Sequence, residues 1–417
     1  MNLDSHHAEP AQARRRILVC TPFPPRLDAK HGGKPTAQLL LRLAGRNDVA
    51  LLSLHAPGEA PVDPALVAKS AHVWEVPLAA GSSIVRRLRW SEGLLRGIPP
   101  WATDCRSTDY TTALESVLDE WRPDVVEIHL QAMAQYVDAP VRRGLPTVLV
   151  DYDPGSAWAE DVARMTRGPR RVVRRVEVSA WRRYERATRG RFDAIVVFAE
   201  RDVAAVAPTA GDAWVTRVPL SVELPAQPLD PEGAEPPTIL FVGSFVHPPN
   251  VDAALWLAQT IFPRVATRVP EARLDLVGHE PGARILALAG GTVSVHGSVP
   301  DVTPYADRAA VVVAPIRIGG SMRGKVLEAL AQGKALVATS RAAEGLDAVA
   351  GQDLLIADRE DEIVDALVRL LQDRGARGQL GENARTWAEA HLGWDDGVIA
   401  FEHVYDTVVA KRTLRVK

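Results

Sequence analysis

Residues 314–346 read APIRIGGSMRGKVLEALAQGKALVATSRAAEGL. This run predicts a strand that ends at Pro315, a glycine-rich turn over 319–324 and a helix that begins near Arg323. Glycines in such a turn let a ligand approach the backbone closely, and the start of the helix presents unpaired amides and a positive dipole end. The arrangement suits an anionic ligand.

Charged side chains surround this turn. Arg317, Arg323 and Lys325 lie at it, and such groups bind phosphate oxygens well. The chain has only seven lysines, so a lysine at a glycine-rich turn is less expected as filler. We therefore expect a phosphate or diphosphate ligand, with Glu328 one turn further on accepting hydrogen bonds from sugar hydroxyls. The alternative is a glycine-rich turn followed by a solvated basic helix.

Short apolar runs typical of buried parallel strands recur on both sides of a proline-rich segment. Those in the first half of the chain are 17–25, 49–54, 73–76, 125–128, 147–150 and 194–198, and those in the second half are 238–243, 272–278, 292–297, 309–315, 335–340 and 353–357. Helical patterns separate most of them. This alternation predicts an α/β protein with two Rossmann-like domains that face each other across a cleft.

The same pattern predicts the domain boundaries. We expect a disordered tail over 1–14, an N-terminal Rossmann-like domain over 15–220 and a linker over 221–237. A C-terminal Rossmann-like domain over 238–395 and a final helix over 396–417, which packs back on the N-terminal domain, complete the chain. The linker prediction rests on prolines and the lack of periodicity.

Composition limits the classes of function. The 49 basic and 52 acidic residues give a formal net charge of −3, so nothing draws the whole chain to nucleic acid. The two cysteines suit a reducing compartment. The polar first 16 residues and the absence of a long apolar run predict a cytoplasmic chain that does not span a membrane.

The decisive run strongly resembles the donor-binding segment of retaining glycosyltransferases of family 4, the glycosyl transferases group 1, which have the GT-B fold. The resemblance extends to Phe241-Val242-Gly243-Ser244-Phe245 with Pro249-Asn250-Val251-Asp252-Ala253, to Leu276-Val277-Gly278 and to Gly297-Ser298-Val299-Pro300. In the first half it is looser: the Gly32-Gly33 loop, Pro123-Asp124-Val125-Val126 and Tyr184-Glu185-Arg186. It covers nearly the whole chain. It implies that the N-terminal domain over 15–220 lies on the acceptor side and that the C-terminal domain over 238–395 binds the nucleotide sugar.

The resemblance implies a hexosyl-type glycosyltransferase that moves a sugar from a nucleoside-diphosphate sugar to an acceptor hydroxyl with retention. It implies no cofactor, no divalent metal and no well-defined protein nucleophile. The acceptor would be a sugar, a glycolipid or a small molecule, in the synthesis of a glycan, polysaccharide, glycolipid or natural product.

Residue roles carry over only where the motifs match. The donor-binding residues implied are Gly33, Gly243, Ser244, Val299, Gly319, Gly320, Ser321, Arg323 and Glu328. Arg317 and Lys325 would stabilise charge on the departing diphosphate, as preorganised cations do in transition states that develop negative charge.

The chain departs from the family pattern at four places. Ser244 and Pro249 stand where many members have an arginine and a lysine, and Gly320 stands where members often have the first of two glutamates. Asp151-Tyr152-Asp153 follows a strand after which a histidine is common, and Leu220-Ser221 replaces a frequent Asn-Gly. We therefore expect the diphosphate charge to be met by Arg317, Arg323 and Lys325.

Candidates in the N-terminal half follow predicted strands or loops. Asp153 would orient an acceptor hydroxyl or stabilise positive charge in the transition state, or else cap a helix that starts near Ser156. His129 and Asp151 would lie on the acceptor side, with a structural histidine as the alternative. Gly33 would sit under the diphosphate or be an ordinary loop glycine. None has metal-ligand spacing, so we expect no metal.

Residues 164–191 hold eleven arginines against Glu177 and Glu185, a local charge of +9 that leaves −12 for the rest. Valines, Trp181 and Tyr184 recur at roughly helical spacing. A basic amphipathic helix predicts peripheral contact with anionic lipid on the inner face of a membrane. The alternative is a solvated helix paired with acids elsewhere.

Competing functions remain open at this stage. A nicotinamide oxidoreductase is disfavoured because no strand is followed by Gly-x-Gly-x-x-Gly with an acidic residue about 20 positions on. A GT-B protein that binds a nucleotide sugar or acts as a scaffold without transfer, and a nucleotide-sugar epimerase, are the alternatives to a transferase.

Overall fold

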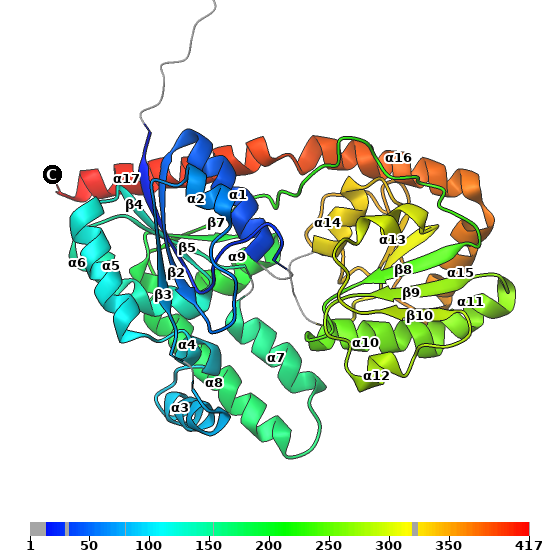
Figure 1. Ribbon diagram of the computed structural model, residues 1–417, viewed down its shortest axis with the longest axis horizontal. Helices are drawn as coiled ribbons and strands as arrows, with labels where there is room; N and C mark the ends of the chain where they lie inside the picture. The colour runs from blue at the N-terminus through cyan, green and yellow to red at the C-terminus, as the bar shows by residue number, and fades with distance from the viewer. Residues whose placement is uncertain (1–13, 30–32, 80, 153, 319–323, 417) are drawn as a thin grey trace, which may run out of the picture.

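The computed structural model describes residues 14–29, 33–79, 81–152, 154–318 and 324–416 (Figure 1). Two parallel β-sheets, of seven and six strands, lie in the two halves of the chain, and helices cover them (Figure 1). This architecture confirms the predicted α/β fold with two Rossmann-like domains. No helix in the described part of the chain combines the length and the apolar character needed to cross a membrane.

The N-terminal sheet has the strand order β3-β2-β1-β4-β5-β6-β7, and every neighbouring pair is parallel. Its strands are β1 (Arg16–Thr21), β2 (Asp48–His55), β3 (His72–Pro77), β4 (Val125–His129), β5 (Thr147–Val150), β6 (Ala194–Val197) and β7 (Trp214–Arg217). Six of the seven match predicted runs. The edge strand β7 has no buried residue and no continuous apolar run, which is why its sequence did not reveal it.

The C-terminal sheet has the order β10-β9-β8-β11-β12-β13, again with parallel neighbours. Its strands are β8 (Thr238–Val242), β9 (Arg273–Val277), β10 (Val293–His296), β11 (Val311–Ala314), β12 (Leu336–Ala338) and β13 (Leu355–Ile356). All six lie within predicted runs. The central strands are rich in valine, leucine and isoleucine because helices bury both of their faces.

Helices fill the connections between strands and pack on both faces of each sheet. In the N-terminal domain they are α1 (Gly33–Arg46), α2 (Pro64–Lys69), α3 (Ser83–Leu95), α4 (Pro100–Asp104), α5 (Thr108–Trp121), α6 (Asp138–Arg142), α7 (Gly155–Met165), α8 (Arg170–Thr188) and α9 (Glu200–Val206). In the C-terminal domain they are α10 (Pro248–Trp256), α11 (Phe262–Arg268), α12 (Ala283–Leu286), α13 (Thr303–Arg308), α14 (Gly324–Ala331), α15 (Glu360–Gln372) and α16 (Arg374–His391).

The last helix, α17 (Trp394–Val416), crosses from the C-terminal to the N-terminal domain. Figure 1 shows it continuing the line of α16 along one side of both domains. Phe401, Tyr405 and Val408 are buried in the same core cluster as Ile17 and Leu40 of the N-terminal domain. The end of the chain therefore forms part of the N-terminal core.

The proline-rich connection between the domains is packed along the C-terminal domain. Leu224 and Leu229 pack against its core, and Leu229 donates its amide to the carbonyl of Gln332. Arg385 also donates to the carbonyl of Pro225 (2.8 Å). These contacts attach residues 224–229 to the C-terminal domain. The chain therefore crosses between the domains just before residue 224, and it crosses back at the start of α17.

The predicted basic segment 164–191 forms two helices. It contains the end of α7, a turn and then α8, so the arginines belong to a helical hairpin and not to one continuous helix. The hairpin projects from the lower part of the N-terminal domain in Figure 1.

Candidate functional site

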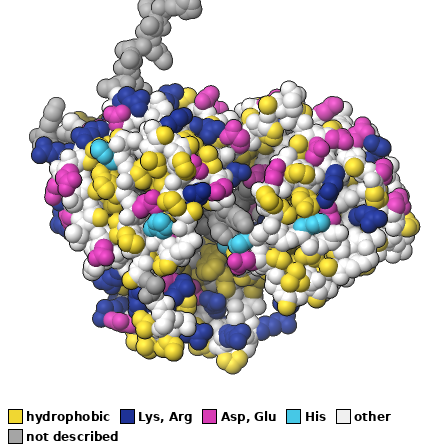
Figure 2. All heavy atoms as spheres, in the orientation of Figure 1, with side chains coloured by type: hydrophobic (Ala, Val, Ile, Leu, Met, Phe, Trp, Pro, Cys, Tyr) yellow, Lys and Arg dark blue, Asp and Glu magenta, His cyan; other side chains and the backbone are white. Residues whose placement is uncertain are grey.

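A cavity of about 910 Å³ lies between the two domains, where the surface in Figure 2 is hollowed. Its walls come from the first turn of α1, the start of the linker, the first turns of α14 and the loops that follow β8, β9 and β10. The three loops leave the carboxyl ends of adjacent strands, the position at which open parallel sheets bind ligands. The fold therefore places a ligand-sized site at the predicted cleft.

Two glycines form tight contacts in the wall of this cavity. A Cβ on Gly278 would lie 1.8 Å from the carbonyl oxygen of Gly243, and one on Gly243 would lie 2.9 Å from Cγ of Asn250. Only glycine lets the loops after β8 and β9 approach this closely. Gly243, a predicted donor-binding residue, therefore lines the cavity through its backbone.

Ser244 lines the cavity beside Gly243. Its Oγ is buried and has no hydrogen-bond partner among the described residues. Because an unsatisfied buried hydroxyl costs free energy, the position suits a polar ligand or a bound water. The serine that replaces the basic residue of many family members is thus a hydrogen-bonding group in the cavity wall.

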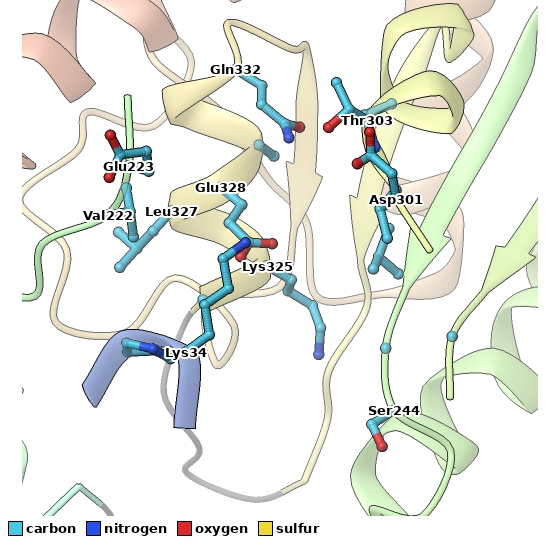
Figure 3. A pocket seen from close by; sticks show the side chains of 18 of the residues that line it. Lys34, Val222, Glu223, Ser244, Asp301, Thr303, Lys325, Leu327, Glu328 and Gln332 are labelled. Atoms are coloured by element: carbon cyan, nitrogen blue, oxygen red, sulfur yellow. The ribbon is translucent and has the colours of Figure 1, made fainter. Parts of the chain in front are cut away.

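Lys325 extends from the first turn of α14 toward the loop that carries Ser244 (Figure 3). Its Nζ donates to Oδ1 of Asn250 (2.6 Å), and Asn250 in turn donates to the carbonyl of Ser244 (2.9 Å). Loss of hydration lowers the pKa of Lys325 to about 8, while Glu328 opposes the shift. Asn250 was not among the predicted site residues, although it belongs to the motif that resembles the family.

Glu328 faces Lys34 across the cavity. In Figure 3, Lys34 reaches from α1 of the N-terminal domain toward the carboxylate of Glu328 on α14. Glu328 is open to the cleft but surrounded by protein, and loss of hydration raises the pKa of its carboxyl, while Lys34 and Lys325 oppose this rise. Lys34 also helps to lower the pKa of Asp301, after the hydrogen bonds from Thr303.

Lys34 is a second cavity residue, besides Asn250, that the sequence analysis did not single out. It directly follows Gly32-Gly33, so a scarce lysine beside a glycine pair was available as a signal, as it was for Lys325. Gly33 begins α1 and is buried, where a Cβ would lie 2.9 Å from that of Ala29. Gly33 does not line the cavity itself, but it starts the helix that brings Lys34 there.

Val299, another predicted donor-binding residue, lines the cavity in the loop after β10. Gly319, Gly320, Ser321 and Arg323 of the donor turn lie outside the described residues, as does Asp153, which was predicted to be catalytic.

Arg317 is placed differently from its prediction as a catalytic residue. Its guanidinium forms a two-point ion pair with Asp252 (2.9 and 3.1 Å) and stacks over Trp256 at 4.3 Å from the ring centroid. It does not line the cavity. The acidic residue and the ring on α10 engage the guanidinium, so Arg317 serves to fix the strand-end loop against α10.

His129 and Asp151, which were predicted on the acceptor side, do not line this cavity. His129 is fully buried and shares hydrogen bonds with Glu127 (2.5 Å) and Tyr152 (3.2 Å). Asp151 is fully buried and forms an ion pair with Arg189 (2.9 Å). His129 ends β4 and Asp151 directly follows β5, and each has a buried partner that holds its side chain in the core.

Ion pairs join the two domains near the site. Arg341 of the C-terminal domain contacts Asp161 on α7 (3.1 Å), and Arg201 on α9 contacts Glu344. As for metals, no three histidine, cysteine or acidic side chains gather as ligands within the described residues.

Residues 236–373, about a third of the chain, match the family model of glycosyl transferases group 1. No curated protein matches the chain in sequence. The family match covers β8 to α15 and so contains the C-terminal half of the cavity.

Solved structures with a similar fold include sucrose-phosphate synthase from Thermosynechococcus elongatus, with a TM-score of 0.69 and 16% identity over 95% of this chain and 100% of that one. The α,α-trehalose 6-phosphate synthase of Burkholderia multivorans has a TM-score of 0.63 and 13% identity, over 95% and 99% of the two chains. Anabaena HepE, solved with UDP and glucose, has a TM-score of 0.61 and 12% identity, over 94% and 100%.

These similarities identify the fold as GT-B.

Proposed function

We propose that this chain transfers a hexosyl group from a nucleoside-diphosphate sugar to an acceptor hydroxyl, with retention of anomeric configuration and without a metal or cofactor. The observation that carries the proposal is the convergence of two lysines from different domains on one cavity: Lys34 from the start of α1 and Lys325 from the start of α14.

The diphosphate lies between these two helix starts in the proposal. Lys34 and Lys325 supply positive charge, and the helix N-termini supply amides and dipoles. Ser244 donates its Oγ hydrogen to a phosphate oxygen, since it has no other acceptor among the described residues. Gly319, Gly320, Ser321 and Arg323 keep the donor-binding role implied by the resemblance.

Glu328 accepts hydrogen bonds from donor sugar hydroxyls. Lys34 and Lys325 both act to lower the pKa of its carboxyl, so they favour the ionised form, which accepts hydrogen bonds. Val299 lines the far wall of the same cavity and contacts the donor.

The reaction breaks the bond between the anomeric carbon and the diphosphate oxygen and forms one to the acceptor oxygen. Negative charge builds on the departing diphosphate, so cations and amides lower the barrier and the leaving group needs no proton. The sugar passes through an oxocarbenium-like state. The acceptor oxygen attacks the face of the sugar that the diphosphate leaves, which retains the configuration without a protein nucleophile. Its proton passes to the departing phosphate oxygen, so no protein general base is needed.

A thermal-shift screen with UDP, GDP, ADP and TDP tests donor binding. A tight nucleoside diphosphate raises the melting temperature because it binds only the folded state. Nucleoside diphosphate release from matching sugar donors, with and without sugar acceptors, then tests transfer. Binding without release would support a non-catalytic nucleotide-sugar protein, conversion of the donor sugar alone would support an epimerase, and no binding would overturn the proposal.

The acceptor is a sugar, a glycolipid or a small molecule with a free hydroxyl.

A further inference from the structure

Helix α3 has almost no packed face. Of its thirteen residues only Gly93 is buried, and Leu88 and Leu95 are 66% and 86% exposed. Ile84 and Val85 are exposed as well. A helix of this length is marginal in water without packing, and exposed leucines add no stability to it. Its sequence therefore fits a helix that meets a further surface.

The tip of the α7–α8 hairpin has the same character. Val172, Val173 and Val176, in the first two turns of α8, are all exposed, and Val172 is 65% exposed. The two acidic residues of α8, Glu177 and Glu185, are buried further along. Apolar and basic side chains thus share the solvent face of this tip.

Both exposed segments lie along helix α8: residues 170–176 form its start, and α3 meets it about two turns further on, near Arg183. The turn that ends α3 packs on α8, where a Cβ on Gly97 would lie 2.3 Å from Cδ of Arg183. Trp101 on α4 stacks edge-on against Trp181 of α8. We call α3 together with residues 170–176 of α8 the hairpin surface. Figure 2 shows basic and hydrophobic side chains gathered along the lower edge of the molecule, where α3 and α8 lie.

Arginines between α7 and α8 also line a cavity of about 410 Å³. Arg171, Arg175 and Arg186 line it without an acidic partner within 4 Å in the part of the chain that the structure describes, whereas Arg164 and Arg182 pair with Glu160. Guanidinium groups without a carboxylate partner are available to phosphate oxygens. The cavity opens on the same hairpin as the exposed valines.

We propose that the hairpin surface docks on an anionic lipid bilayer. Leu88, Leu95 and Val172 enter the boundary between headgroups and acyl chains, and Arg171 and Arg175 contact lipid phosphates. Apolar and basic groups on one exposed face match that interface, where each gains an environment it lacks in water. A nucleic acid would use the arginines but leave the apolar side chains hydrated.

Docking there would bring the bilayer close to the cleft. Helix α7 starts just after β5, whose carboxyl end faces the cavity side of the sheet, and Asp161 on α7 pairs with Arg341 of the C-terminal domain. The eleven residues of α7 span about 16 Å. This consequence rests on the proposed function and names a membrane lipid as the acceptor class; the docking itself does not depend on it.

Vesicle co-sedimentation tests the docking. The full chain is mixed with vesicles of phosphatidylcholine alone and of phosphatidylcholine with phosphatidylglycerol. Binding is expected only to the anionic vesicles and is expected to weaken with salt. The double variants Arg171→Glu/Arg175→Glu and Leu88→Glu/Val172→Glu should each bind about tenfold or more weakly.

Controls place single changes of the same kind elsewhere on the surface. Arg369→Glu on α15 and Ile399→Glu on α17 are exposed and should bind like the native chain. Native-like binding by both double variants, equal binding to neutral vesicles, or no binding by the native chain would overturn the proposal. Self-association through this face, seen as a dimer lost in L88E/V172E without vesicle binding, would also overturn it.

A second readout separates the two proposals. The melting-temperature rise with a nucleoside diphosphate should be unchanged in both double variants, because the hairpin surface lies outside the cavity. Vesicle binding without any nucleotide response would leave the docking surface intact and refute the transferase. A nucleotide response without vesicle binding would refute the docking surface and leave the transferase proposal intact.

Discussion

Lys325 and Lys334 lie at opposite ends of α14 and share one property. Burial lowers the pKa of each to about 8. Lys334 is fully buried and donates to two backbone carbonyls, those of Asp230 and Asp307, the second at 3.0 Å. Lys325 donates to a single oxygen among the described residues, that of Asn250, and borders the cavity.

The difference shows what separates a structural lysine from a binding one. An ammonium group has three hydrogen-bond donors, and Lys334 uses two of them on backbone carbonyls that join the linker to the C-terminal domain. Lys325 uses one donor on Asn250, so its other two can bind a ligand in the cavity. An equal pKa shift therefore says nothing about function until the acceptors are known.

Lys325→Met should have the largest effect on activity. Transfer should fall about 100-fold or more, the scale of losing one preorganised donor to a developing charge. The melting temperature should not fall, because the desolvation cost is removed with the charge. Steady-state kinetics and thermal unfolding check the two halves. Lys69→Met on exposed α2 is the control, and transfer near the native rate would remove Lys325 from the site.

Lys34→Ala should lower transfer about tenfold, since it removes a charge-assisted contact made from the second domain. The loss should appear in the donor KM or in kcat without a change in melting temperature, because the side chain is exposed. Lys69→Ala serves as the matched exposed lysine. Unchanged donor kinetics would leave Lys325 as the only described lysine of the site.

Lys334→Met should act on stability and not on binding. Two buried carbonyls lose their donor, which lowers the free energy of unfolding by about 1–3 kcal/mol. Chemical unfolding measures this loss, and calorimetry on the folded protein should give native affinity for a nucleoside diphosphate. A weaker affinity with unchanged stability would instead assign Lys334 a role in ligand binding.

The lowered pKa of Lys325 predicts how the free energy of unfolding and the affinity for a diphosphate each change with pH. Its pKa is about 8 in the folded protein against an ordinary lysine pKa of 10.5, so the unfolded chain holds more protons between these pH values. The free energy of unfolding of the ligand-free protein therefore rises over this window, with a parallel contribution from Lys334.

Diphosphate binding runs the opposite way. The ligand requires charged Lys325, so affinity should fall by about tenfold per pH unit above pH 8. Isothermal titration across pH 7 to about 10 measures this slope. Lys325→Arg should flatten it, because arginine stays charged. A slope that persists in the arginine variant would assign it to another group.

Local sequence predicted the elements of the fold well. Twelve of the thirteen strands lie at predicted runs, because a strand buried on both faces must be apolar throughout. The exception, β7, is a half-buried edge strand. The start of α14 near Lys325 was predicted for a similar reason, since glycines followed by a helical pattern mark a helix start locally.

Side-chain partners were predicted less well. Arg317 was expected at the diphosphate, but Asp252 and Trp256 lie on an element about 60 positions earlier in the chain and engage it. His129 and Asp151 follow strand ends, where site residues are common, yet Glu127 and Arg189 hold them in the core.

By itself the sequence determined two parallel sheets, the cleft between them and a cationic helix start beside it, because periodicity and turn chemistry act between near neighbours. Only the tertiary structure decided that Lys34 joins Lys325 at the cavity, that Arg317 turns away and that α3 and α8 share one exposed surface. Those contacts join segments far apart in the chain, and packing alone selects among the partners available.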